Sequence, residues 1–182
     1  MKIALGCDHG GLEHKNAILK QLTEMGHDVT DFGIYENTSV DYPDIAKKVC
    51  ESIQKGENAL GILVCGTGIG MSIAANKHKG IRAAACSEHF SAKYTRLHNN
   101  SNVLCLGGRV IGVGTALELV DLFVNTEFEG GRHQKRIDKI SEIIKITAIS
   151  KIDNSPISLF PIILKTNIKK KYKKNVFKII LI

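Results

Sequence analysis

The sequence predicts an α/β fold in which a parallel sheet of about five strands lies between two layers of helices. Short apolar runs alternate with segments in which apolar residues recur every three or four positions. The runs are continuously apolar, which is typical of parallel strands that helices cover on both faces. Polar and glycine residues follow directly after most of these runs, where an open parallel sheet binds its ligands.

Five apolar runs are the expected strands. They cover residues 3–7, 28–32, 61–65, 83–87 and 103–106. Because a helical pattern follows each run, the chain reads as repeated strand–helix units. Such units predict a three-layer, doubly wound parallel sheet of the Rossmann-like type.

Six segments have helical spacing. The first ends before Gly26, a helix-stop residue, and the fourth begins after Ser87, a suitable N-cap. The expected helices cover residues 12–25, 45–53, 70–76, 87–98, 116–124 and 133–146. The last of them is a C-terminal helix that follows the five strands.

The net charge of +7 does not predict a nucleic-acid-binding protein, because of where the charge lies. Residues 147–182 hold eight lysines and one acid, so residues 1–146 are neutral overall. We therefore expect one folded domain over 1–146 and a Lys/Ile/Asn-rich C-terminal extension over 147–182. We expect this extension to be a basic appendage without fixed structure. One alternative is an arm that binds a membrane surface or nucleic acid, and another is a segment whose isoleucines cover part of the domain or of a partner chain.

Several classes of protein are excluded by composition. The cysteines are odd in number and lack C-x-x-C spacing, which argues against a disulfide framework or a zinc site. No apolar stretch is long enough to span a membrane, and the N-terminus is too short for a signal peptide. We expect a cytoplasmic protein that needs no metal and contacts neither membrane nor nucleic acid.

The glycine-rich loop at residues 65–70 fits neither nucleotide-binding template. Met71 stands where a dinucleotide fingerprint needs glycine, and no Gly-Lys-Ser/Thr follows. A ribose-binding role for Glu88 stays open, because its distance along the chain is suitable. Three glycines at a helix start present free N–H groups to one point, which suits any anion, including an enediolate formed during a reaction.

Cys65 lies at the first position of this loop and is a candidate general base. A thiol at a helix N-terminus is stabilised as a thiolate, which could remove a proton from carbon. The alternative is a buried cysteine that only ends a strand. Thr67 could move a proton on a substrate oxygen or could simply shape the turn.

Polar residues after the first strand and at the end of the fourth helix are further candidates. Asp8 and His9 could orient sugar hydroxyls or the ring oxygen, or could close the loop as a satisfied pair. His98 could act as an acid or base, or could complement the helix dipole.

A basic cluster opens the last helix. Arg132 and Arg136 are four residues apart and share one helix face, which suits a phosphate dianion; on these residues alone a solvated basic face is the alternative to be preferred. Arg109, after the fifth strand, could join them.

The motifs taken together resemble the ribose-5-phosphate isomerase type B family, which also includes galactose-6-phosphate isomerase subunits. The resemblance covers residues 1 to about 146. It is carried by Gly6-Cys7-Asp8-His9, Asp41-Tyr42-Pro43, Cys65-Gly66-Thr67-Gly68-Ile69-Gly70, His98-Asn99, Gly107-Gly108-Arg109 and Glu129-Gly130-Gly131-Arg132-His133.

The resemblance implies interconversion of ribose 5-phosphate and ribulose 5-phosphate in the pentose phosphate pathway, without a cofactor. Cys65 would move the proton between C1 and C2, with Thr67 and His98 acting in sugar-ring opening. A homodimer or tetramer with the site between subunits is also implied. The enediolate would be held by the loop Gly66, Thr67, Gly68, Ile69 and Gly70, the sugar by Asp8, His9, Tyr42 and Asn99, and the phosphate by Arg109, Arg132, His133 and Arg136.

Two other functions stay open at this point. The motifs do not decide sugar length, so the substrate could be galactose 6-phosphate or allose 6-phosphate. The chain could also be a non-catalytic sugar-phosphate-binding subunit. The presence of Cys65, Thr67 and His98 favours an enzyme, because a binding module needs no proton transfer.

Overall fold

The computed structural model describes the backbone of residues 1–153 and the side chains of residues 1–143. Residues Met1–Glu142 form one compact unit, and the chain divides into a second unit at Ile143. Within the second unit, the described part is the end of helix α6 (Arg132–Asp153). This helix is longer than the predicted 133–146, so residues 147–153, the start of the predicted extension, are helical. The remainder of the extension lies outside the described residues.

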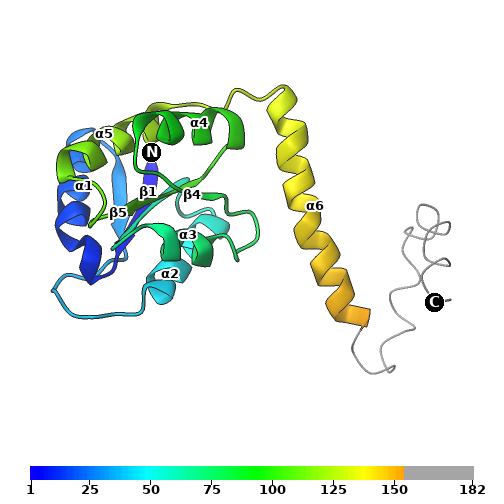
Figure 1. The fold of residues 1–182 in the computed structure, drawn as a ribbon, viewed down its shortest axis with the longest axis horizontal. Coiled ribbons are helices and arrows are strands. Elements are labelled where there is room, and N and C mark those ends of the chain that lie inside the picture. The colour runs from blue at the N-terminus through cyan, green and yellow to red at the C-terminus, as the bar shows by residue number, and fades with distance from the viewer. Residues whose placement is uncertain (154–182) are drawn as a thin grey trace. The chain divides into compact units, whose positions relative to one another are not determined.

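A parallel sheet forms the centre of the compact unit (Figure 1). Its strand order is β2-β1-β3-β5-β4, and every neighbouring pair is parallel. All five predicted strands are confirmed. Their bounds are β1 (Lys2–Cys7), β2 (Asp28–Asp31), β3 (Leu60–Cys65), β4 (Ala83–Ala85) and β5 (Val103–Gly107).

Helices cover both faces of the sheet, as the doubly wound fold predicts. On one face the side chains of Ile3, Leu5 and Leu104 join α1, α4 and α5 in one core cluster. On the other face Ala4 and Leu63 join α2 and α3 in a second cluster. The helices are α1 (Leu12–Glu24), α2 (Tyr42–Gln54), α3 (Ile69–Ala75), α4 (His89–Asn99) and α5 (Val113–Asn125), with a short 3-10 turn, η1 (His9–Gly11).

The start of α4 corrects one expectation. Its N-cap is Glu88, not Ser87, because the Glu88 carboxylate accepts from the N–H groups of Phe90 and Ser91 at 2.7 and 2.8 Å. Hydrogen bonds, foremost those from Ser91, lower the pKa of Glu88. This carboxylate therefore has a structural role as a helix cap, which accounts for an acidic residue at this position without a bound nucleotide.

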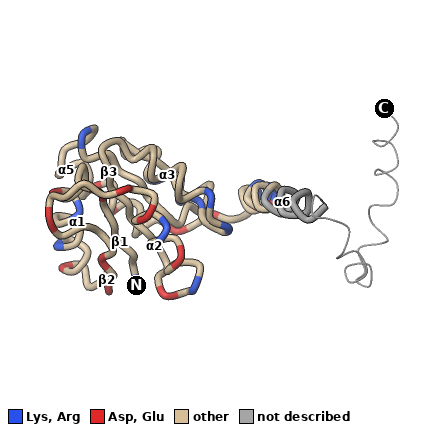
Figure 2. Tube along the Cα trace, turned by 90° about the horizontal axis from the view of Figure 1, so that it is seen from below, with Lys and Arg blue, Asp and Glu red and all other residues tan. Residues whose placement is uncertain are grey.

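Acidic and basic residues are interspersed along the chain of the compact unit (Figure 2). This agrees with the balanced charge of residues 1–146. No helix within residues 1–153 is both long and apolar enough to cross a bilayer.

Candidate functional site

Three loops meet at the carboxyl edge of the sheet, where β1, β3 and β5 end. The N–H of Gly108 donates to the Cys65 carbonyl at 2.8 Å, and the N–H of Arg109 donates to the Gly66 carbonyl at 3.0 Å. The Asp8 N–H donates to the Val64 carbonyl at 3.1 Å. β2 and β3 pair with opposite edges of β1, so the strand order reverses next to β1 and these loops flank a topological switch point, where open α/β sheets bind ligands.

Glycines allow these loops to approach one another. A Cβ on Gly107 would lie 2.8 Å from the carbonyl carbon of Thr67, and a Cβ on Gly10 would lie 2.9 Å from the Gly66 nitrogen. Real Cβ atoms do not approach backbone atoms this closely. Because these positions have no side chains, loop 65–70 can lie directly against the backbone at Gly10 and Gly107.

Cys65 is buried, with 4% of its surface exposed, and its Sγ accepts from the Gly68 N–H at 3.1 Å. Gly68 has a left-handed φ of 76°, a conformation that glycine adopts readily, and the chain enters α3 from this residue. Within residues 1–153, the N–H groups of Gly66, Thr67 and Gly70 donate to no protein acceptor. The loop thus combines a thiol with amide donors that are available to an anion.

The other four cysteines lie in environments that keep them protonated. Burial raises the pKa of Cys7 and of Cys86 to about 11 and that of Cys50 to about 12. Burial also raises the pKa of Cys105 well above its usual value. Among the five, Cys65 is the one that begins the glycine-rich loop.

The remaining predicted residues at this edge lie around the loop. Tyr42, at the start of α2, packs on Gly70, where a Cβ would lie 2.8 Å from the Tyr42 Cζ. Thr67 and Arg109 are exposed. The Asp8 carboxylate accepts from the Gly10 N–H at 2.8 Å, so it closes its own loop. We call this set, with His9 and Cys65–Gly70, the carboxyl-edge group.

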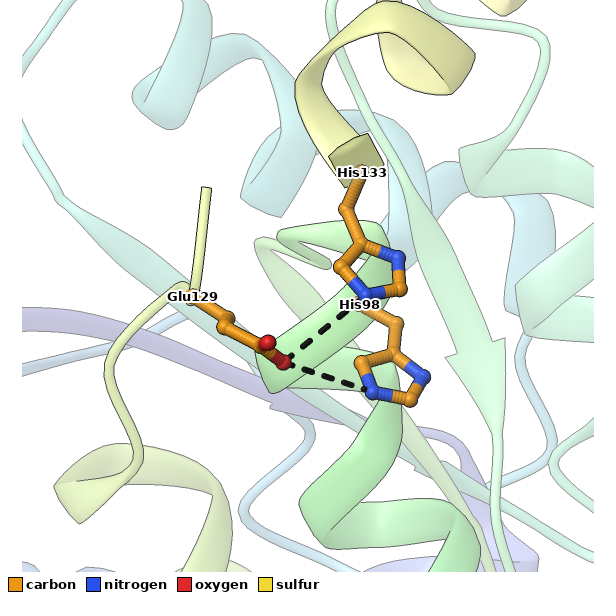
Figure 3. A group of neighbouring side chains, drawn as sticks. All are labelled: His98, Glu129 and His133. Carbon is orange, nitrogen blue, oxygen red and sulfur yellow. Dashed lines mark ion pairs between the residues drawn. The ribbon is translucent and has the colours of Figure 1, made fainter. Parts of the chain in front are cut away.

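A second set of predicted residues gathers where α4 ends. The ring of His98 stacks on the ring of His133, with centroids 4.1 Å apart and planes 8° from parallel (Figure 3). One oxygen of Glu129 lies 3.6 Å from the His98 Nε2 and 3.7 Å from the His133 Nε2. We call this set the amino-edge group; its members are His98, Asn99, Glu129, Arg132, His133 and Arg136.

The two groups lie at opposite ends of the sheet within one chain. α4 begins at the carboxyl edge after β4 and runs back, so His98 is next to the segment that enters β5 at its amino end. Eleven helical residues at about 1.5 Å each separate the two edges by roughly 16.5 Å. Arg109 is therefore not joined to Arg132 and Arg136 within a chain, contrary to one expectation from the sequence.

Glu129 is the member of the amino-edge group that the sequence prediction did not select. Its position four residues before His133 was the available signal, but the contact with His98 depends on the packing of α4. The Arg132 Nε donates to the His133 Nε2 at 3.4 Å. Burial, followed by the charges of His98, Arg132 and Arg136, lowers the pKa of His133, although Glu129 opposes this.

Two histidines and a carboxylate are also a metal-ligand set, with ligand atoms within 4.8 Å of one another. Imidazole lone pairs lie in the ring planes, and these planes are nearly parallel and stacked, so the lone pairs run side by side rather than converge. The Arg132 guanidinium also occupies the Nε2 side of His133. The parallel rings and the nearby guanidinium do not fit a metal centre.

Comparison with known proteins identifies close relatives of residues 1 to about 146. The family model described as Ribose/Galactose Isomerase matches residues 3–140. The ribose-5-phosphate isomerase B of Escherichia coli strain K12 is 48% identical over 142 residues, covering 78% of this chain and 95% of its own.

Solved structures agree with this assignment. The ribose-5-phosphate isomerase B of Clostridium thermocellum is 50% identical, with a TM-score of 0.80 over 81% of this chain and 99% of its own. A ribose 5-phosphate isomerase from Thermotoga maritima is 52% identical, with a TM-score of 0.76 over 78% of this chain and 97% of its own.

Proposed function

Because this chain belongs to the ribose/galactose isomerase family, we propose that it interconverts ribose 5-phosphate and ribulose 5-phosphate through an enediolate, with Cys65 as the base. The single observation that supports the role of Cys65 is its position at the first residue of a loop whose amide N–H groups are available as donors. The place of this reaction is the pentose phosphate pathway, in the cytoplasm.

The chemistry follows from the loop. The Cys65 thiolate takes the proton from C2 of the open-chain aldose, and the electron pair moves onto O1. The resulting enediolate is stabilised by the N–H groups of Gly66, Thr67 and Gly70, which need not reorganise as the charge forms. The thiol then returns the proton to C1 while the hydroxyl proton on O2 moves to O1, so that C2 becomes the carbonyl carbon and the ketose forms without an external reductant or oxidant.

The distance between the two groups supports a site completed by a second copy of the chain. One chain supplies Cys65 and its loop, and the other supplies the amino-edge group. In this arrangement His98 acts with Thr67 in opening the sugar ring, while Asp8, His9, Tyr42 and Asn99 contact the sugar. The phosphate binds Arg109, Arg132, His133 and Arg136, so that Arg109 joins the other arginines across the interface. A homodimer is the smallest assembly with this property.

The test is ketose formation from ribose 5-phosphate, galactose 6-phosphate and allose 6-phosphate. Ribose 5-phosphate should give the highest kcat/KM. Cys65→Ala should lower kcat by about 10²–10⁴-fold with little change in substrate affinity. Cys50→Ala, which removes a buried thiol from α2, is the matched control and should keep wild-type kcat. Near-normal kcat for Cys65→Ala would refute the role of Cys65, and no turnover of any sugar phosphate would favour a binding subunit.

A further inference from the structure

We propose that Glu129 is a positioning residue for His98, holding the Nε2 side of the imidazole so that Nδ1 is left to move a proton on the sugar. The inference rests on the proposed function, in which His98 acts in ring opening. It assigns a role to a carboxylate that lies outside the predicted site residues.

The backbone fixes Glu129 beside His98. The Glu129 N–H donates to the carbonyl of Leu97, the residue before His98, at 3.0 Å. Nearby, the Arg96 Nε donates to the Thr126 carbonyl at 3.2 Å. Residues 126–129 are therefore attached to the last turn of α4, which places the backbone of Glu129 beside His98, and the half-exposed Glu129 carboxylate lies 3.6 Å from the His98 Nε2.

His133 does not donate a proton to the Glu129 carboxylate, so this carboxylate is available to His98. The His133 Nε2 accepts from the Arg132 Nε at 3.4 Å, and a nitrogen that accepts there cannot also carry a proton toward Glu129. Burial lowers the pKa of His133, which agrees with a neutral ring. The proton that faces the carboxylate therefore belongs to the Nε2 of His98, and the stacked neutral ring of His133 limits rotation of His98.

The tautomer decides which nitrogen can react. With its proton on Nε2, His98 has its lone pair on Nδ1, on the side of the ring away from Glu129 (Figure 3). In ring opening the C1–O4 bond breaks and its electron pair leaves on O4. Nδ1 takes the proton of the anomeric hydroxyl, which becomes the C1 carbonyl, and returns that proton to O4. The transient imidazolium is stabilised by the Glu129 carboxylate.

Glu129→Gln tests the proposal, because the amide is neutral and can present an N–H to Nε2, which favours the wrong tautomer. The matched control is Glu127→Gln, an exposed carboxylate of the same segment. Two reactions are compared for each variant. Turnover of ribose 5-phosphate requires ring opening, whereas deuterium uptake at C1 of ribulose 5-phosphate does not, since the phosphate on its C5 oxygen prevents furanose closure.

The expected result is a fall of about 10–100-fold in kcat for ribose 5-phosphate with KM nearly unchanged, and deuterium uptake within twofold of wild type. Glu129→Asp, which keeps the charge, should recover most of the lost turnover. The proposal is overturned if Glu129→Gln behaves as Glu127→Gln does, if only KM rises, or if uptake and turnover fall equally. An inactive wild-type enzyme would instead refute the proposed function.

Discussion

Gly107→Ala should lower kcat, because the new side chain would displace the catalytic loop, residues 65–70. The new Cβ would lie 2.8 Å from the Thr67 carbonyl carbon and 2.9 Å from its oxygen. Ordinary carbon–carbon contact needs roughly 3.5 Å, so loop 65–70 must retreat by about 0.7 Å. A misplacement of this size costs up to about 100-fold in rate, and such overpacking costs about 1–3 kcal/mol of stability. We therefore expect kcat to fall by about 10–100-fold.

The assay is ketose formation from ribose 5-phosphate, with urea unfolding as the measure of stability. Gly114→Ala is the matched control, because Gly114 lies in the first turn of α5 and a Cβ there meets nothing within 4 Å. That variant should keep wild-type kcat and be as stable as wild type or more so. A folded Gly107→Ala enzyme with kcat within twofold of wild type would refute the reasoning that the seating of the loop sets the rate.

Two further predictions concern parts of the chain away from the loop. A chain ending at Asp153 should keep its kcat/KM for ribose 5-phosphate. The reason is that 95% of the Escherichia coli relative aligns with only 78% of this chain. A large loss of activity would instead show that residues 154–182 contribute to catalysis. Hydrogen bonds in the folded state lower the pKa of Glu88 below its unfolded value, so its contribution to stability is present above that value and is lost as the pH falls. In urea unfolding between pH 3 and 7, Glu88→Gln should therefore weaken the pH dependence over the acid range, and an unchanged dependence would count against the cap.

The fold was predictable because its signals are local. Continuous apolar runs mark buried parallel strands, and Gly26 marks the end of α1. The N-cap of α4 was predicted one residue early, because Ser87 and Glu88 both suit the position and only the backbone decides between them. The end of α6 was underestimated, since the helical pattern continues into a segment of different composition.

The site was predictable as a set of residues but not as an arrangement. The chemistry of Cys65 and its loop can be read from one short stretch of sequence. The separation of His98 from Cys65 depends on the direction of α4 across the sheet, which residue types do not reveal. The role of Glu129 depends on a contact between segments distant in the chain, so no local pattern could assign it.

The central claim is that Cys65 of one chain works with His98 of another, and mixing two inactive variants tests it directly. Cys65→Ala and His98→Asn chains are refolded together, and mass spectrometry verifies that mixed dimers form. Each mixed dimer would hold one intact site and one doubly altered site. Random pairing therefore predicts about 25% of wild-type turnover of ribose 5-phosphate. A mixture that contains mixed dimers and stays as inactive as either variant alone would contradict the claim.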